Sequence, residues 1–125
     1  MTKSCNRENM TKWIEALESG KYPQDALGGY LKTERGFCCL GVLEDVAGAK
    51  WVKDNDRFET RDGYYAMPAP HRLQTFLGTN EGDTVLVYDP EMGIDRGVHS
   101  LNDNGKSFTH IAGLLRAEFG IPKAE

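Results

Sequence analysis

Two adjacent cysteines, Cys38 and Cys39, are the residues of this sequence with the most direct chemistry. They stand in the stretch GFCCLGVLEDV, at the start of an apolar run. A thiolate becomes a good nucleophile when a helix N-terminus or a cation lowers its pKa, and Cys38 precedes a predicted helix with Arg35 nearby. If the protein is an enzyme, we therefore expect Cys38 to be the nucleophile. The candidate bases are His71, His99 and His110.

Packing is the favoured interpretation of the same pair. Cys39 falls on one stripe with Val42, Leu43 and Val46, which is the spacing of a helix buried on most sides. Free cysteine is among the most buried residue types. A structural zinc site needs four ligands, usually with a C-x2-4-C pair, and adjacent cysteines with isolated histidines do not supply them. We therefore expect no metal and no cofactor.

A dense polar stretch, LNDNGKS, precedes the predicted C-terminal helix. A helix N-terminus carries unpaired N–H groups and the positive end of the helix dipole, so Lys106 and Ser107 could hold a phosphate or carboxylate. A nucleotide-hydrolysing P-loop is excluded because Ser100 stands where its first glycine is required. The favoured interpretation is that Ser107 caps the helix and that Asn102, Asp103 and Asn104 build the turn leading into it, and a cap can sit beside a bound anion.

Aromatic residues at strand ends and in loops could stack on a planar ligand such as a nucleobase. Together with the polar stretch they define the predicted ligand-binding set. Its members are Asn102, Asp103, Lys106, Ser107, Arg35, Tyr30 and Trp51.

Helical periodicity predicts most of the elements that must position these residues. Apolar side chains recur at helical spacing over residues 10–17, 39–46 and 108–119. A shorter helix is predicted over 71–77 with Leu73, Phe76 and Leu77 facing inward.

Strands are predicted around residues 30–32, around Phe37 and over 84–89, with a turn at 33–36 joining the first two. The dipeptide Asp62-Gly63 suits a two-residue hairpin, which would pair Thr60 with Tyr65 and Phe58 with Met67. The mixture of helices and hairpins predicts a single compact α+β domain over residues 1–125. We expect a small antiparallel sheet of hairpins packed with about four short helices.

Composition excludes several classes of protein. Hydrophobic residues make up 39% of the 125 residues and charged residues 27%, which is not the composition of a disordered chain. The net charge is -4 and the basic residues are scattered, so duplex nucleic acid is not an expected partner.

The sequence also indicates where the protein works. No run approaches the roughly 18 apolar residues of a membrane span, and the N-terminus lacks the apolar centre of a secretion signal. We expect a cytoplasmic protein without membrane contact, whose cysteines stay reduced and which folds alone or as a homo-oligomer.

Three motifs resemble those of an uncharacterised family of small bacteriophage and prophage proteins. They are ALESGKYPQ in a first helix with Trp13, then GFCCLGVLEDV, then LNDNGKSFTHIAGLL. In the family they form a CCLGVL core motif and an LND-x-G-x-SF-x-x-IA ending, and the likeness is weakest over 55–95. A third cysteine often stands in these relatives at the position of Glu44, so its absence here argues against a cysteine-based metal or redox site.

The resemblance implies a host-modulating or counter-defence role in the host cell cytoplasm. Our leading hypothesis is a non-catalytic binder that sequesters a small nucleotide-derived signalling molecule in a pocket bordered by residues 102–107. One alternative is an inhibitor that binds a host protein directly, which an exposed apolar patch would favour. The other is a small cysteine-dependent hydrolase, which a thiol with a low pKa would favour.

Overall fold

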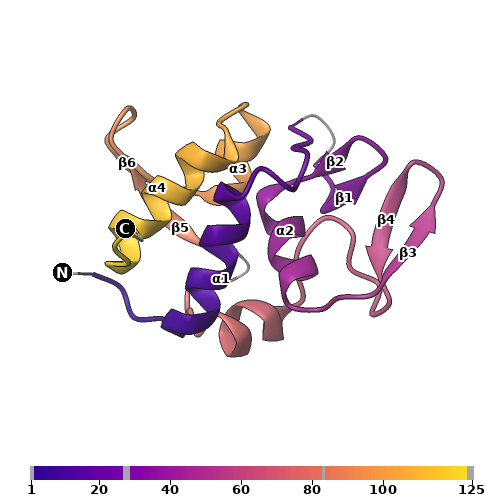
Figure 1. Ribbon diagram of the computed structural model, residues 1–125, viewed down its shortest axis with the longest axis horizontal. Coiled ribbons are helices and arrows are strands. Elements are labelled where there is room, and N and C mark those ends of the chain that lie inside the picture. Colours follow the sequence, from indigo (N-terminus) through magenta and orange to yellow (C-terminus); the bar gives the residue numbers. More distant parts are fainter. Residues whose placement is uncertain (1, 27–28, 83, 124–125) are drawn as a thin grey trace.

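Helices occupy the middle of the molecule, with a small antiparallel sheet at either end (Figure 1). The computed structural model describes residues 2–26, 29–82 and 84–123. The helices are α1 (Arg7–Glu18), α2 (Cys39–Val46), the π-helix η1 (Arg72–Phe76), α3 (Val98–Asp103) and α4 (Phe108–Phe119). This arrangement confirms the predicted α+β class.

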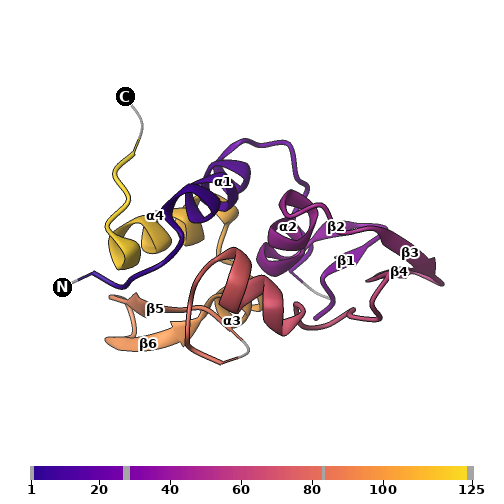
Figure 2. The ribbon, with the colours of Figure 1, turned by 90° about the horizontal axis from the view of Figure 1, so that it is seen from below.

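The two sheets differ in size and topology. The larger one has the strand order β2-β1-β4-β3, and the smaller one is the hairpin β5-β6. Their strands are β1 (Lys32–Thr33), β2 (Gly36–Phe37), β3 (Trp51–Asp54), β4 (Arg57–Thr60), β5 (Leu86–Asp89) and β6 (Ile94–Gly97). Figure 2 shows the hairpin beside α4 and the larger sheet beyond α2, so the two sheets border separate surfaces.

Helix α1 forms where the apolar periodicity predicts it. Asn6 caps its N-terminus by accepting a hydrogen bond from the backbone N–H of Asn9 at 3.1 Å. Its buried side chains are Met10, Trp13, Ile14 and Leu17. The indole N–H of the fully buried Trp13 donates to the carbonyl oxygen of Cys39 at 2.9 Å, which ties α1 to the start of α2.

Helix α2 lies unusually close to the chain that enters β1. A Cβ atom added to Gly41 would stand 1.8 Å from the carbonyl oxygen of Leu31, so only glycine fits there. The backbone N–H of Cys38 donates to that same oxygen at 3.0 Å. The predicted strand-turn-strand pattern before α2 is confirmed, with β1 pairing Lys32 with Phe37.

Helix α4 begins and ends at the predicted residues. Ser107 accepts a hydrogen bond from the backbone N–H of His110 at 3.1 Å, which confirms its role as the N-cap. Gly120 ends the helix with a left-handed φ of 64°, a conformation that favours glycine.

The predicted hairpin about Asp62-Gly63 is wrong. Residues 57–60 do form a strand, but β4 pairs with β3 across the turn Asn55-Asp56, where Asn55 has a φ of 59°. Asparagine tolerates the positive φ of a tight turn, so Asn55-Asp56 can also reverse the chain, and the residues on either side of it can pair in register. A tight turn over residues 60–64 does include Asp62-Gly63, and hydrogen bonds of 2.8 Å close it from Gly63 N–H to the Thr60 carbonyl oxygen and from Thr60 N–H to the Tyr64 carbonyl oxygen. The described residues between this turn and η1 form no strand, so no second strand pairs with β4 there.

Asn102 and Asp103 belong to a helix instead of the turn that we predicted there. Residues 98–103 form helix α3, with Val98 and Leu101 buried at a spacing of i, i+3. The six residues of α3 are too few to show a helical periodicity, and the pattern of residues before them does not indicate strand β6 either. Only Asn104 to Ser107 remain as the connection to α4.

The short helix predicted over 71–77 contains the π-turn η1, in which the backbone N–H of Leu77 donates to the Arg72 carbonyl oxygen at 3.1 Å. Leu73 and Leu77 face inward as predicted, and Phe76 is partly buried against the core. The guanidinium of Arg72 pairs at 3.1 Å with Glu44, a buried residue of α2, and so fixes η1 to the core.

An ion pair joins the C-terminal ends of α1 and α4. Arg116 donates Nε to Oε2 of Glu18 at 2.9 Å and Nη2 to Oε1 at 2.6 Å, which is the bidentate geometry of a strong pair. The hydrogen bonds from Arg116 lower the pKa of Glu18 below its ordinary value.

We expect Glu18→Gln to lower the free energy of unfolding by about 1 kcal/mol at pH 7, because the pair is only partly buried. A carboxyl whose pKa is lowered on folding stabilises the fold above its unfolded pKa of about 4.3 and loses that effect as the pH falls. Urea unfolding at a series of pH values should therefore show the difference between parent and variant shrinking below about pH 4. Glu15→Gln, at an exposed position of the same helix, is the control. An equal loss in both variants would contradict the role of the pair.

Candidate functional site

The two adjacent cysteines are packed rather than poised for reaction. Cys38 is 6% exposed and caps α2, with its Sγ accepting from the backbone N–H of Gly41 at 3.3 Å. Cys39 is fully buried and its thiol donates to the Val98 carbonyl oxygen at 3.4 Å. Burial raises the pKa of Cys38 to about 11 and holds the pKa of Cys39 well above its ordinary value. Neither thiol has the low pKa that a cysteine nucleophile needs.

The three histidines have different surroundings. His99 shares a hydrogen bond with Thr84 at 3.0 Å, and His71 is exposed at the start of η1. The Nε2 atom of His110 is buried without a hydrogen-bond partner. Within the described ranges no histidine bonds to a cysteine, and no three metal-ligating side chains are grouped as a metal site would require.

The predicted residues of the polar stretch mostly hold the fold together. Asn102 is fully buried and donates its Nδ2 to the backbone oxygen of Asp25 at 3.1 Å. Its Oδ1 accepts from Nε2 of Gln24 at 2.9 Å, and the same Nε2 donates to the backbone oxygen of Lys106 at 2.7 Å. The Lys106 amine pairs with Glu91 at 2.7 Å. These contacts fasten the segment after α1 to the α3–α4 connection.

Arg35 belongs to the same polar network. Its Nη2 lies 3.1 Å from Oδ2 of Asp25, a buried carboxylate that also accepts from the hydroxyl of Thr33. Asp25 thus brings the predicted residues Arg35 and Asn102 together, one through its carboxylate and the other through its backbone. Asp103 is exposed and lies outside these contacts.

A cation surrounded by aromatic rings lies on the larger sheet. The amine of Lys32 stands 4.5 Å from the ring centre of Phe58, 5.0 Å from that of Phe37 and 5.4 Å from that of Trp51. We call these four residues the Lys32 cluster. All four are partly exposed, and in the described part of the chain no carboxylate pairs with the Lys32 amine. The arrangement combines a positive charge with ring surfaces.

Register explains why these four side chains meet. Lys32 of β1 lies opposite Phe37 of β2 on one side and Phe58 of β4 on the other. Trp51 lies on the same face of the sheet, because it is two residues before Lys53, which pairs with Phe58. Trp51 is the one member of the cluster that we predicted as a ligand residue.

Tyr22 and Asp45 fix the rim of the Lys32 cluster. Asp45, near the end of α2, accepts from the indole N–H of Trp51 at 3.0 Å and from the hydroxyl of Tyr22 at 2.6 Å. The Phe37 ring stands edge-on to Tyr22 at 5.0 Å and to Trp51 at 6.2 Å. Burial and the Asp45 hydrogen bond raise the pKa of Tyr22 to about 12.

Tyr30, the other predicted aromatic, lies elsewhere. It contacts Tyr65 at 6.1 Å between ring centres, and Arg57 stands 5.3 Å from Tyr30 and 4.0 Å from Tyr65. Arg57 pairs in register with Thr33, so it projects from the face of the sheet opposite to Lys32. Tyr30 and Trp51 therefore do not share one site.

The sequence held a partial signal for the cluster. The predicted hairpin over 30–37 already brings Lys32 close to Phe37. Phe58 joins only because β1 pairs with β4, across more than twenty residues of chain, and no local pattern indicates that pairing.

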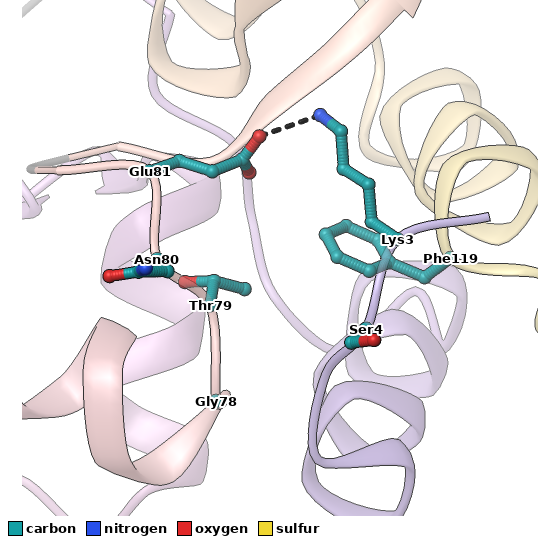
Figure 3. A pocket seen from close by; sticks show the side chains of 7 residues that line it. All are labelled: Lys3, Ser4, Gly78, Thr79, Asn80, Glu81 and Phe119. Carbon is teal, nitrogen blue, oxygen red and sulfur yellow. Dashed lines mark hydrogen bonds and ion pairs between the residues drawn. The ribbon is translucent and has the colours of Figure 1, made fainter. Parts of the chain in front are cut away.

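A separate cavity lies between the N-terminal segment and the loop after η1 (Figure 3). It has a volume of about 320 Å³ and is lined by Lys3, Ser4, Gly78, Thr79, Asn80, Glu81 and Phe119. Figure 3 shows the Lys3 and Glu81 side chains joined across it, at an N–O distance of 2.6 Å.

A family model described as "Domain of unknown function (DUF8296)" matches residues 5–119. The chain belongs to this family. The DUF8296 match runs from before α1 to the end of α4 and so includes every residue of the Lys32 cluster. No curated protein and no solved structure matches the chain. In the part of the DUF8296 chain that the structure describes, no helix has the length and apolar character to cross a bilayer.

We expect serine substitutions at the two adjacent cysteines to differ in their effect on stability. Cys38→Ser should change the free energy of unfolding by less than about 0.5 kcal/mol, because serine is a favoured N-cap. Cys39→Ser should cost about 1–3 kcal/mol, because it replaces a fully buried thiol with a more polar hydroxyl, whose shorter bond to Cβ sets it farther from the Val98 carbonyl oxygen. Urea unfolding of both variants measures the difference. Equal losses would show that Cys38 is not a cap.

The raised pKa of Tyr22 predicts a tyrosine that ionises late. In an ultraviolet absorbance titration of the folded protein, one tyrosine should ionise near pH 12. Tyr22→Phe should abolish that last step, and Asp45→Asn should move it to lower pH because the carboxylate no longer opposes the tyrosinate charge. A late step that persists in Tyr22→Phe would disprove the assignment.

Proposed function

We propose that the protein is a non-catalytic binding protein for a small nucleotide-derived anion, which it holds at the Lys32 cluster. The observation that carries this proposal is the Lys32 amine, held over three rings without an acidic partner among the described residues. A phosphate would gain an ion pair with this amine. The nucleobase would stack on the aromatic surface beside it, as bases do on sheet aromatics in other nucleotide-binding folds.

The rim residues support a binding role because they make the cluster rigid before a ligand arrives. Asp45 holds the Trp51 ring through its indole N–H, and Phe37 is held between Trp51 and Tyr22. A ligand that meets fixed rings loses less affinity to the ordering of side chains.

Binding rather than catalysis is also favoured by the chemistry of the thiols. The cysteine-dependent hydrolase that we considered needs a reactive thiolate, whereas burial raises the pKa of Cys38 to about 11. The polar stretch over 102–107, where we first placed the ligand, uses Asn102, Lys106 and Ser107 for internal contacts. The Lys32 cluster therefore replaces that stretch as the proposed site.

The proposed biological role rests on the resemblance to small bacteriophage proteins. A phage protein that sequesters a nucleotide-derived signal of the host would blunt the defence that the signal activates. Such a protein needs affinity and abundance but no turnover, which suits a small domain with a preformed binding surface.

Isothermal titration calorimetry with cyclic mononucleotides, cyclic dinucleotides and linear nucleoside diphosphates tests the proposal. We expect at least one of these probes to bind the parent chain at micromolar concentration. Lys32→Met keeps the apolar stem over the rings and removes the charge, so it should weaken binding about tenfold or more, as the loss of a charge-assisted contact does.

The matched control is Lys12→Met, on the exposed face of α1, which should bind like the parent. No binding by any probe at micromolar concentration would overturn the small-ligand proposal. Equal weakening by both lysine variants would move the site away from the Lys32 cluster.

A further inference from the structure

A polar cavity of about 200 Å³ lies where three segments of the chain meet. Residues 48–50, between α2 and β3, form one wall, and residues 60–62, at the end of β4, form another. Arg72, the first residue of η1, completes the lining. The N–H of Arg61 donates to the Lys50 carbonyl oxygen at 2.8 Å, so the first two walls are joined by the backbone.

Arg72 has hydrogen-bond donors that the fold does not use. Its Nε donates to Oε1 of Glu44 at 3.1 Å, and the other oxygen of that carboxylate accepts from the backbone N–H of Ala69 at 3.3 Å. The side chains of Glu44 and Arg72 are 1% and 15% exposed, so this contact holds the guanidinium in place. Over the described residues, neither Nη atom of Arg72 has a hydrogen-bond partner.

Lys50 and Arg61 add positive charge to the same lining. Both residues are exposed, and neither side chain forms an ion pair or hydrogen bond within residues 2–26, 29–82 and 84–123. Asp62 is the one carboxylate among the described residues of the lining, and Glu44 balances the charge of Arg72. The cavity therefore keeps an excess of positive charge in a chain whose net charge is -4.

We propose that this cavity binds a phosphate group. The Nη groups of Arg72 donate to its oxygens, and the Lys50 amine and the Arg61 guanidinium pair with it from the exposed side.

The donor set favours phosphate over a carboxylate. A guanidinium matches two oxygens of a phosphate at once, and the remaining oxygens are left for the other two cations. A carboxylate has only two oxygens and cannot contact all three cations equally well. Because Glu44 already orders the Arg72 side chain, little affinity is lost to immobilising it.

This site is independent of the nucleotide site proposed above. None of the four residues of the Lys32 cluster lines the cavity. Removing the charge of Lys32 should therefore leave phosphate binding at the cavity unchanged, so the two proposals can fail separately.

A nitrogen–proton correlation spectrum tests the proposal by titration with sodium phosphate at fixed pH, with sodium chloride at matched ionic strength as the control. Phosphate at millimolar concentration should shift the Nε–H resonance of Arg72 and the backbone amides of Gly48 and Asp62 in a saturable way. Glycerol phosphate is the second probe. Tighter binding than inorganic phosphate would identify the occupant as a phosphate ester, and equal or weaker binding would identify it as the free ion.

Lys50→Gln and Arg61→Gln should each weaken phosphate binding about threefold or more, because each removes one positive charge from the lining. Both positions are exposed, so the fold should be kept. The matched control is Lys21→Gln, which removes another exposed lysine and should bind like the parent. The proposal is overturned if phosphate causes no saturable shift, if chloride causes the same shifts, or if Lys21→Gln weakens binding as much as the other two variants.

Discussion

The contact between Gly41 and Leu31 is the constraint on which the larger sheet depends. The two backbones approach so closely that a side chain at position 41 would overlap the Leu31 carbonyl group. Helix α2 therefore lies directly against the chain that enters β1, and Lys32 follows at once in that strand. From the far end of the same helix, Asp45 reaches Trp51. One close packing contact thus fixes both the cation and a ring of the Lys32 cluster.

Polar residues in this fold serve two different purposes. Asp25 and Asn102 are buried and hydrogen-bonded, and their contacts join the segment after α1 to the α3–α4 connection. Buried polar groups must be paired, so such a network specifies the packing of the loops. Lys32 differs because its partners are ring faces. A cation held in this way keeps its capacity to pair with an anion, which is why we place the ligand there.

Local patterns predicted the longer helices well but missed α3, because 12-residue helices such as α1 and α4 carry enough apolar repeats to define a face and a six-residue helix does not. The sheet was harder. Asn55-Asp56 and Asp62-Gly63 both suit tight turns, and only the pairing of β4 with β3 and β1 decides between them. The Lys32 cluster depends on that long-range register, so the sequence supplied Trp51 but not its neighbours. The polar stretch was hard to interpret for a related reason. Asn102 bonds to the backbone of Asp25, which lies 77 residues away along the chain, and no local pattern indicates that contact.

The most direct measurement of the central claim uses the two indole N–H resonances of the protein in a nitrogen–proton correlation spectrum. Trp13 is fully buried and bonds to the Cys39 carbonyl oxygen, while Trp51 lies in the Lys32 cluster. Titration with a nucleotide that binds should shift the Trp51 indole resonance in a saturable way and leave that of Trp13 in place. Binding that moves neither indole, or that moves Trp13 alone, would contradict the assignment of the site to the Lys32 cluster.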